Sequence, residues 1–491
     1  MSVFKGLKPE ALWQYFEEIC RIPRLSGNEG KIRQYLLEFA EHHNLEAKED
    51  HAGNVLITRP SHPDHLNRKI VVLQSHLDMV GEKTAGHPHD WTKDPVIPLS
   101  DGEWIRAGGT TLGADDGIGI AAQMAVLTDK TLRAGTIECL FTVDEESGMS
   151  GAKELTEDFF RGRILLNLDS EDEGILFIGS AGGMDTVGTM RYTREAVPPG
   201  YVGLEISLSG LQGGHSGDEI HKGLGNSVKI MTAILTELDR EHGIRLSKFD
   251  GGNLRNAIPR EAYAVILCRK SGSENIISHL KTIETGLRKK FGDLERNLKL
   301  EAAECTMPSH VMDRGSQDGL LRALSCCPHG VIAWSEDMKD LVETSSNLAS
   351  VKFEPAGFVT IVSSQRSSFE ASKAEASAMV EDCLKQAGAT VTKSAGYPGW
   401  APDINSEILG ITRQAYRRLF GKDPEVKAIH AGLECGLIYE KFRKMDMISF
   451  GPTIRGAHTP DEKIEIRTVP MFWNLLMEVI NNIPLKSGYS I

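Results

Sequence analysis

Acidic and imidazole side chains gather at several places in this chain where metal binding or acid–base chemistry could occur. They are His76-Leu77-Asp78, Asp115-Asp116, Glu145-Glu146 and Asp169, with His458 near the C-terminus as a further candidate. Carboxylates that lie close together raise one another's pKa, and burying them unpaired is costly, so a cation is expected among them. Imidazole beside carboxylates favours zinc, manganese or cobalt over magnesium or calcium.

The size of this set bears on the number of metal ions. Two imidazoles and at least three carboxylates are more ligands than one tetrahedral ion needs. The set therefore favours two ions about 3.5–4 Å apart that share a carboxylate and a water. Each motif alone also has an ordinary explanation: His-x-Asp is commonly a surface or capping pair, Glu-Glu a solvated loop, and Asp after a strand the cap of a helix.

Short apolar runs typical of buried β-strands precede most of these motifs. The runs, each with the side chains that follow it, are 69–75 with His76 and Asp78, 136–143 with Glu145 and Glu146, and 163–168 with Asp169. In open α/β sheets, ligands bind beyond the carboxyl ends of the strands. We therefore expect these side chains to converge at one edge of a sheet.

The Asp115-Asp116 pair has a different setting. It follows a glycine-rich loop, 108–114, and precedes an alanine-rich apolar stretch, 118–127, that suits a helix buried against a sheet. We expect this pair to join the others from the start of that helix.

The order of the motifs resembles the co-catalytic di-zinc exopeptidases, and within them the aminoacyl-histidine dipeptidases. His-x-Asp is followed by Gly-Ala-Asp-Asp-Gly, Asp-Glu-Glu, Asn-Leu-Asp-Ser-Glu and, near the C-terminus, His-Thr-Pro-Asp-Glu. The likeness covers essentially the whole chain, including residues 397–400 and 429–436. It implies an α/β fold: a mixed-sheet catalytic domain with helices on both faces, and an inserted α+β lid domain.

The resemblance also implies the metal ligands. His76 and Asp169 would hold one zinc ion, Glu146 and His458 a second, and Asp115 would bridge the two. The peptide bond between Asp115 and Asp116 would be cis. Cobalt or manganese could replace zinc, because the same ligands suit them.

Two further carboxylates have catalytic roles in such a site. Asp78 resembles the residue that orients His76, so that the other ring nitrogen faces the metal. Glu145 resembles the general base, which takes a proton from a water that the metal ions activate and passes it to the leaving amine.

The length of 491 residues supports two domains, since one core rarely exceeds about 250–300 residues. The metal-ligand motifs vanish between Gly183 and Tyr397, so we expect the catalytic domain at 1–183 and 398–491 and the lid at 184–397. Periodicity predicts two α+β halves in the lid. The first has strands near 202–208 and 262–266 around a helix near 228–238, and the second has strands near 351–353 and 358–362 before a helix near 370–385.

The lid contains the candidate substrate-binding residues. Gly213-Gly214-His215-Ser216-Gly217 is by itself most simply a flexible turn. The resemblance implies instead that His215 binds the developing oxyanion, with Asn256 as a second polar contact. Arg366 would pair with the C-terminal carboxylate of the substrate, and Gly432 would contribute backbone contact at the same end.

These roles imply a zinc-dependent dipeptidase, because a carboxylate receptor facing a metal pair accepts very short peptides only. A preference for C-terminal histidine, including β-alanyl-histidine, comes only from the resemblance. A broader aminotripeptidase and an N-acyl amino acid deacylase are alternative enzymes. An inactive relative that binds peptides or metal is the alternative outside enzymes.

Composition limits the remaining possibilities. The net charge of −13 argues against nucleic-acid binding. No apolar run approaches the roughly 18–20 residues of a membrane span, so we expect a cytoplasmic protein that does not bind membranes, as a homodimer with complete active sites. The eight cysteines, with Cys139 and Cys268 in apolar strands, predict buried thiols rather than a disulfide framework. The adjacent pair Cys326-Cys327 lacks Cys-x-x-Cys spacing, so we assign it no metal. Amphipathic helix is expected within 16–45, with no chemical role.

Overall fold

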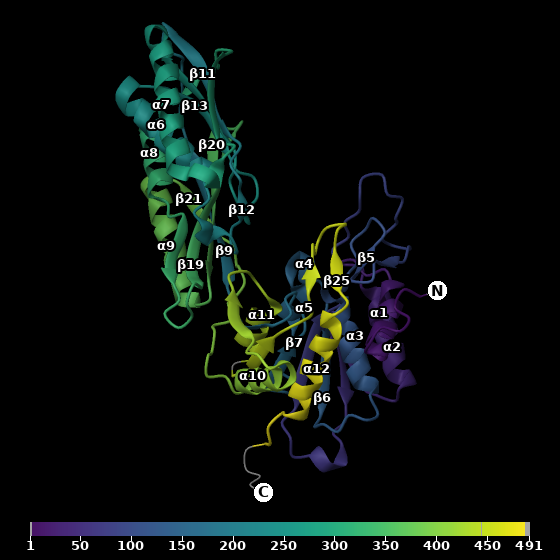
Figure 1. The fold of residues 1–491 in the computed structure, drawn as a ribbon. Helices are drawn as coiled ribbons and strands as arrows, with labels where there is room; N and C mark the ends of the chain where they lie inside the picture. Colours follow the sequence, from purple (N-terminus) through teal and green to yellow (C-terminus); the bar gives the residue numbers. More distant parts are fainter. Residues whose placement is uncertain (1, 443, 487–491) are drawn as a thin grey trace. The chain divides into compact units, whose positions relative to one another are not determined.

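The computed structural model describes residues 2–442 and 444–486, which fall into two compact units (Figure 1). Unit 1 comprises Met1–Ser180, Trp400–Ala428 and Leu433–Ile491. Unit 2 comprises Ala181–Gly399 and Ile429–Gly432.

The main sheet of unit 1 is mixed. In its described part it has eight strands, and the four neighbouring strands β6, β3, β7 and β23 run parallel, whereas β1, β2 and β8 are antiparallel to their neighbours. All side chains of β3, β6 and β7 are buried, as expected for the centre of a parallel sheet. The order across the sheet is β1 (Glu46–Glu49), β2 (Val55–Arg59), β6 (Ile137–Thr142), β3 (Val71–His76), β7 (Ile164–Asn167), β23 (Asp446–Ser449), β8 (Ile175–Ser180) and β22 (Glu425–Ile429).

Helices cover both faces of this sheet (Figure 1). They include α1 (Glu10–Cys20), α2 (Gly30–His42), α3 (Ala114–Thr128), α10 (Glu407–Phe420), α11 (Glu434–Lys441) and α12 (Thr468–Asn481). The predicted buried helix after the aspartate pair is α3, in which every residue from Asp116 to Leu127 is buried. The smaller sheet of unit 1 has the order β24 (Ile454–Arg455), β25 (Lys463–Glu465), β5 (Trp104–Ala107) and β4 (Pro98–Ser100).

The main sheet of unit 2 is antiparallel and has nine strands within the described residues. Its order is β16 (Lys299–Cys305), β11 (Tyr201–Ser209), β15 (Ala262–Arg269), β13 (Arg245–Gly251), β19 (Val342–Glu354), β20 (Phe358–Ser367), β9 (Gly182–Arg191) and β21 (Thr390–Lys393), with β18 (Gly330–Trp334) paired to β19. Both predicted series of elements lie in this one sheet and its helices. The two parts of the sheet meet where β13 and β19 pair at Gly251 and Val351.

One hydrophobic core joins this sheet to its helices. Leu204, Ile206 and Leu208 alternate along β11 and are buried against it, as the sequence pattern predicts. The helices that supply the opposing side chains are α6 (Ser227–His242), α7 (Ser273–Phe291), α8 (Arg314–Cys326) and α9 (Glu370–Gln386) (Figure 1).

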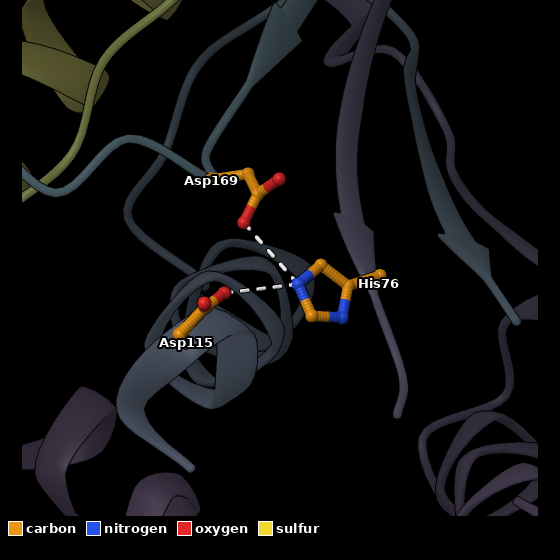
Figure 2. Close-up of side chains that lie close together, drawn as sticks. All are labelled: His76, Asp115 and Asp169. Atoms are coloured by element: carbon orange, nitrogen blue, oxygen red, sulfur yellow. Dashed lines mark hydrogen bonds and ion pairs between the residues drawn. The ribbon is translucent and has the colours of Figure 1, made fainter. Parts of the chain in front are cut away.

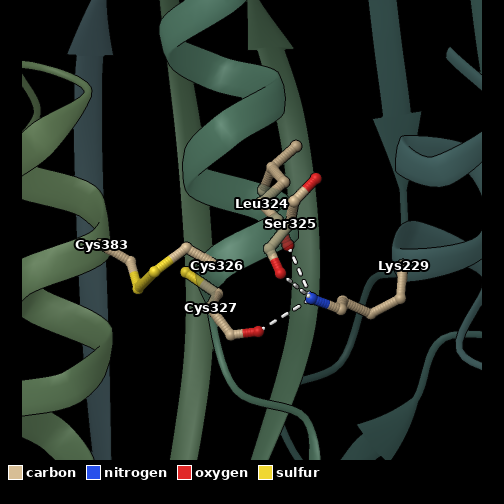
Figure 3. Close-up of a disulfide and its surroundings, with 6 residues drawn as sticks. All are labelled: Lys229, Leu324, Ser325, Cys326, Cys327 and Cys383. Carbon is tan, nitrogen blue, oxygen red and sulfur yellow. Dashed lines mark hydrogen bonds between the residues drawn. A yellow bond between two sulfur atoms is a disulfide. The ribbon is translucent and has the colours of Figure 1, made fainter. Parts of the chain in front are cut away.

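The prediction of thiols throughout is wrong at one pair. Cys326, at the end of α8, forms a disulfide with Cys383 of α9, 57 residues away (Figure 3). Sequence spacing could not reveal this pair, because the two helices meet only in the folded unit. Cys139 and Cys268 are buried thiols, as predicted. Beside the disulfide, the Lys229 ammonium donates hydrogen bonds to the carbonyls of Leu324, Ser325 and Cys327 (Figure 3).

None of the helices in the described residues is both long and apolar enough to cross a bilayer.

Candidate active site

The parallel strands of unit 1 deliver the predicted side chains to one edge of the sheet. His76 is the last residue of β3, and Asp78 follows it. Glu145 and Glu146 open the short helix α4 (Glu145–Gly148) just after β6, and Asp169 lies two residues beyond β7. Because β6, β3 and β7 are parallel neighbours, their carboxyl ends lie together.

Asp115 enters the same region from the start of α3. It departs from helical backbone geometry, and its peptide bond to Asp116 is cis, as predicted. Gly113, which precedes the helix, has φ +70°, a left-handed conformation that glycine adopts without a steric penalty.

The ligand atoms form two triads around imidazoles. His76 Nε2 lies 3.0 Å from Asp115 Oδ1 and 3.3 Å from Asp169 Oδ1 (Figure 2). His458 Nε2 lies 3.0 Å from Glu146 Oε2 and 3.3 Å from Asp115 Oδ2. Asp115 therefore presents one carboxylate oxygen to each imidazole.

These distances suit metal coordination. A tetrahedral zinc ion with bonds of about 2.0–2.1 Å holds its ligand atoms about 3.3 Å apart. The ligand atoms of each triad lie within 4.8 Å of one another, and the donors are imidazole nitrogens and carboxylate oxygens. Each triad thus has the donor types and spacing that a divalent transition metal needs.

The electrostatics of the triads link metal binding to proton release. Hydrogen bonds with Asp115 and then Glu146 raise the pKa of His458 to about 11. Burial raises the pKa of Asp169 to about 7, although the charge of His76 opposes this shift. Protons therefore bind strongly where a cation would bind, and a metal ion must displace them.

Asp78 holds two parts of the site in place. Its Oδ1 accepts a hydrogen bond of 3.0 Å from the Glu145 backbone N–H and lies 3.4 Å from His76 Nδ1. Its Oδ2 accepts bonds of 3.1 Å from the Glu146 N–H and 2.7 Å from Ser26 Oγ. Burial opposes ionisation of Asp78, but the hydrogen bond with His76 and the other donors lower its pKa to about 2. The ionised carboxylate therefore orients His76 and the start of α4 together.

Glu145 has the environment of a proton-transfer group. Burial raises its pKa well above the ordinary value, and the negative charges of Asp169 and Glu434 add to this effect, while His76 opposes it. A carboxyl group with a raised pKa holds a proton more readily, as a group that accepts a proton and passes it on must.

Glu462 is a structural part of the site that the sequence analysis missed. This buried carboxylate accepts hydrogen bonds of 2.7, 2.8 and 2.7 Å from the backbone N–H groups of Leu112, Gly113 and Ala114, and one of 3.3 Å from Asp115. It thereby fixes the loop that delivers the shared carboxylate. Its position in the His-Thr-Pro-Asp-Glu motif marked it as a candidate site residue. Its role could not be predicted, because the N–H groups it binds lie about 350 residues earlier in the chain.

Arg24 is a second structural part of the site that the sequence analysis missed. The predicted amphipathic segment, residues 16–45, is divided into α1 and α2, and the turn between them contains Arg24 and Ser26. The buried Arg24 guanidinium donates hydrogen bonds of 2.9 Å to the Leu77 carbonyl and 2.6 Å to the Asp78 carbonyl, and it also bonds the Gly113 carbonyl. It connects the end of β3 to the start of α3. No local pattern identified it.

Buried polar side chains also connect the central strands beneath the site. Glu434 Oε2 accepts 2.7 Å hydrogen bonds from Gln74 Nε2 of β3 and Thr142 Oγ1 of β6. Gln74 Oε1 accepts a 2.6 Å bond from Asn167 Nδ2 of β7, and Asn167 Oδ1 accepts one from Ser449 of β23. Burial raises the pKa of Glu434 to about 8.

The predicted substrate-binding residues all lie in unit 2, and His215 sits on the short strand β12 (Gly214–His215). Its Nδ1 faces the backbone N–H groups of Asp218 at 3.1 Å and Gly217 at 3.3 Å, and Asp218 Oδ2 lies 3.3 Å away. The two N–H groups and the carboxylate hold the ring through Nδ1, which leaves Nε2 available to a different partner.

Asn256 and Gly432 have different surroundings. Asn256 is exposed beside His215: its carbonyl accepts a 2.8 Å bond from the Ser216 N–H, and Ala257 of β14 (Ala257–Ile258) pairs with His215. Gly432 lies against the ring of Tyr397, where a Cβ atom would come within 2.8 Å of a ring carbon.

Arg366 lies on β20 and is 9% exposed. Its Nη1 donates a 2.9 Å hydrogen bond to the Tyr397 hydroxyl. A buried guanidinium with few partners is suited to binding a carboxylate.

Comparisons with known proteins agree with this geometry. The model of peptidase family M20/M25/M40 matches residues 72–482. The chain is 42% identical to the cytosol non-specific dipeptidase of Escherichia coli (strain K12) over 99% of this chain and 100% of the relative. The crystal structure of aminoacylhistidine dipeptidase from Vibrio alginolyticus has a TM-score of 0.92 and 41% identity, covering 99% of each chain. A tripeptidase from Staphylococcus aureus, 18% identical with a TM-score of 0.56 over 97% of this chain and 99% of its own, shares the fold. The chain belongs to peptidase family M20/M25/M40, whose members are metal-dependent.

Proposed function

We propose that this protein is a dipeptidase that uses two zinc ions to hydrolyse short peptides with a free C-terminal carboxylate. The observation that carries the proposal is Asp115, which offers one oxygen to the His76 triad and the other to the His458 triad. The names of the two relatives at 42% and 41% identity, both dipeptidases, support the same activity.

The proposed metal ligands divide into two sets. His76 and Asp169 would hold one ion and Glu146 and His458 the other, with Asp115 offering one carboxylate oxygen to each. The metal ions would supply Lewis acidity, which polarises the substrate carbonyl and lowers the pKa of the attacking water. Cobalt or manganese could take the place of zinc.

The protein's own groups then move the proton. Glu145 accepts a proton from the attacking water as the oxygen adds to the peptide carbonyl, and it passes this proton to the leaving amine. Asp78 keeps His76 and the Glu145–Glu146 turn in position through its hydrogen bonds.

The residues of unit 2 bind the substrate in this proposal. His215 Nε2–H donates to the carbonyl oxygen as negative charge develops there, and Asn256 adds a polar contact. Arg366 pairs with the C-terminal carboxylate, and Gly432 contributes backbone contact. In this role residues 184–397 act as a lid, and a substrate that must use both the metal ligands and the carboxylate receptor is a short peptide.

The substrate range distinguishes the candidates. We propose Xaa-His dipeptides, including β-alanyl-histidine, because one relative is named an aminoacylhistidine dipeptidase. The other relative's name, non-specific dipeptidase, favours additional dipeptides. The test is to assay the zinc-loaded protein on β-alanyl-histidine, alanyl-histidine, a tripeptide and an acetylated amino acid. Fastest cleavage of a dipeptide is expected, and preference for the tripeptide or the acetylated compound would contradict the proposal.

We further propose a cytoplasmic homodimer in which each chain has a complete active site. The name of the E. coli relative supports the location. Sedimentation equilibrium tests the dimer.

A further inference from the structure

The Tyr397 hydroxyl is the hydrogen-bond partner of the Arg366 guanidinium. Among the described residues, this 2.9 Å bond to Nη1 is the one side-chain contact of hydrogen-bonding length that Arg366 makes. Nε is buried and has no partner there, so that edge of the guanidinium is closed to a ligand. The N–H groups left for a carboxylate are the two on Nη2 and the second one on Nη1, which form the end of the fork.

The Tyr397 ring is tightly held from two sides. A Cβ atom on Gly183 would lie 2.7 Å from the ring, and one on Gly432 would lie 2.8 Å from it. Both positions therefore require glycine for the ring to fit where it does. The two glycines come from chain segments about 250 residues apart, so the ring position depends on the folded unit.

The backbone of Tyr397 is also fixed. Its N–H donates a 2.9 Å bond to the Gly183 carbonyl, and its own carbonyl accepts a 3.0 Å bond from the Gly183 N–H. The same carbonyl accepts a 2.6 Å bond from Lys373 Nζ, and Lys373 is only 2% exposed. A buried lysine in this position leaves the tyrosine little freedom to move.

We propose that Tyr397 is a positioning residue, which holds Arg366 so that the end of its guanidinium fork receives the C-terminal carboxylate of the substrate. This inference rests on the proposed dipeptidase function. An arginine side chain has several rotatable bonds, and fixing one N–H group in advance reduces the entropy lost on binding. The hydroxyl accepts from the guanidinium and does not compete for the remaining donors.

The test is Tyr397→Phe, which removes only the hydroxyl. Steady-state kinetics of the zinc-loaded protein on alanyl-histidine should show KM raised about ten-fold with kcat changed less than two-fold. The reason is that the lost hydrogen bond to the charged Arg366 serves substrate binding and takes no part in the chemical step. For alanyl-histidine amide, which lacks the carboxylate, the variant and the unchanged protein should have the same kcat/KM. Tyr416→Phe is the matched control: it removes a hydroxyl that donates a 2.6 Å bond to Glu173 in unit 1, and it should leave both KM values unchanged.

A double-mutant cycle with Arg366→Met separates positioning from general stability. Tyr397→Phe should have no further effect on KM when Arg366 is already replaced, because the hydroxyl acts through that side chain. Additive effects, an unchanged KM in Tyr397→Phe, or equal losses on the acid and the amide would overturn the inference.

Two results keep the inference distinct from the proposed function. If the unchanged protein cleaves neither β-alanyl-histidine nor alanyl-histidine, the proposed function is wrong. If Tyr397→Phe does not fold, Gly183→Ala displaces the ring and leaves the hydroxyl in the protein, and it should raise KM for the acid and not for the amide. Equal KM values for Gly183→Ala and the unchanged protein would count against the positioning role.

Discussion

Glu145 is the residue on which the proposed chemistry depends most. Replacing it with glutamine keeps the size of the side chain and removes its ability to accept a proton. We expect Glu145→Gln to bind zinc as the unchanged protein does and to lose at least a hundred-fold in kcat, since general-base catalysis contributes about 10²–10⁴-fold. Metal analysis beside dipeptide hydrolysis measures both. Glu154→Gln, an exposed glutamate on α5 (Ser150–Glu154), is the control, and a Glu145→Gln protein with near-normal turnover would refute the role.

Asp78 is expected to affect metal affinity rather than proton transfer. The two Asp78 carboxylate oxygens contact Ser26, the N–H groups of Glu145 and Glu146, and the His76 ring. Asp78→Asn replaces one of these oxygens with an NH2 group and removes the negative charge. Loss of such a partner to a metal-binding histidine lowers metal affinity by about 10–100-fold. Competition for zinc with a chelating dye measures this change. An Asp78→Asn protein with unchanged zinc affinity would show that His76 keeps its orientation without the carboxylate.

At the scale of elements, the loop before α3 depends on Glu462. Its carboxylate accepts hydrogen bonds from four backbone N–H groups. In glutamine only one of the two terminal side-chain atoms can accept such bonds, because the other is an amide nitrogen. Each buried N–H left unpaired costs about 1–3 kcal/mol, so Glu462→Gln should lower the free energy of unfolding by several kcal/mol and weaken zinc binding. Glu465→Gln, three residues later in β25, is the matched control. Denaturant unfolding and zinc titration give the two quantities, and a Glu462→Gln protein as stable as the control would contradict this account of the loop.

Glu434, at the start of α11, makes stability depend on pH. Burial raises its pKa from 4.5 to about 8, so between these pH values the folded protein keeps a proton that the unfolded chain has lost. Stability therefore falls as pH rises through this range, by up to about 1.4 kcal/mol per pH unit.

Glu434→Gln should remove this contribution, because an amide does not ionise. The metal-free variant is expected to be more stable than the unchanged protein at pH 8 and nearly equal to it at pH 4.5. Thermal unfolding across pH 4.5–8 measures the difference, with Glu440→Gln, an exposed residue of the same helix, as control. Parallel pH profiles for Glu434→Gln and the unchanged protein would show that Glu434 does not titrate in this range.

The sequence predicted those elements whose local pattern carries the information. The runs before His76, Glu145 and Asp169 are short and apolar, which indicates buried strands, and the topology of parallel strands then brings their ends together. Arg24, Glu462 and the Cys326–Cys383 bond were not predicted, because each acts on residues far away in the chain. No periodicity or spacing encodes such contacts.

For the whole molecule, the proposed metal binding and the proposed substrate binding belong to different units, so each can be tested by its own substitutions. The proposed metal ligands, His76, Asp115, Glu146, Asp169 and His458, all belong to unit 1, whereas the proposed substrate-binding residues belong to unit 2. Substitutions of the proposed metal ligands in unit 1 should therefore change metal content, and substitutions of the proposed substrate-binding residues in unit 2 should change KM and substrate choice without loss of metal.

The most direct measurement is a zinc titration of the chelator-treated protein, followed by calorimetry and by dipeptide hydrolysis in the same samples. The account predicts two zinc ions per chain, negligible hydrolysis before metal is added, and one bound ion fewer in His458→Ala. Saturation by a single zinc ion, or full hydrolysis by the metal-free protein, would contradict it.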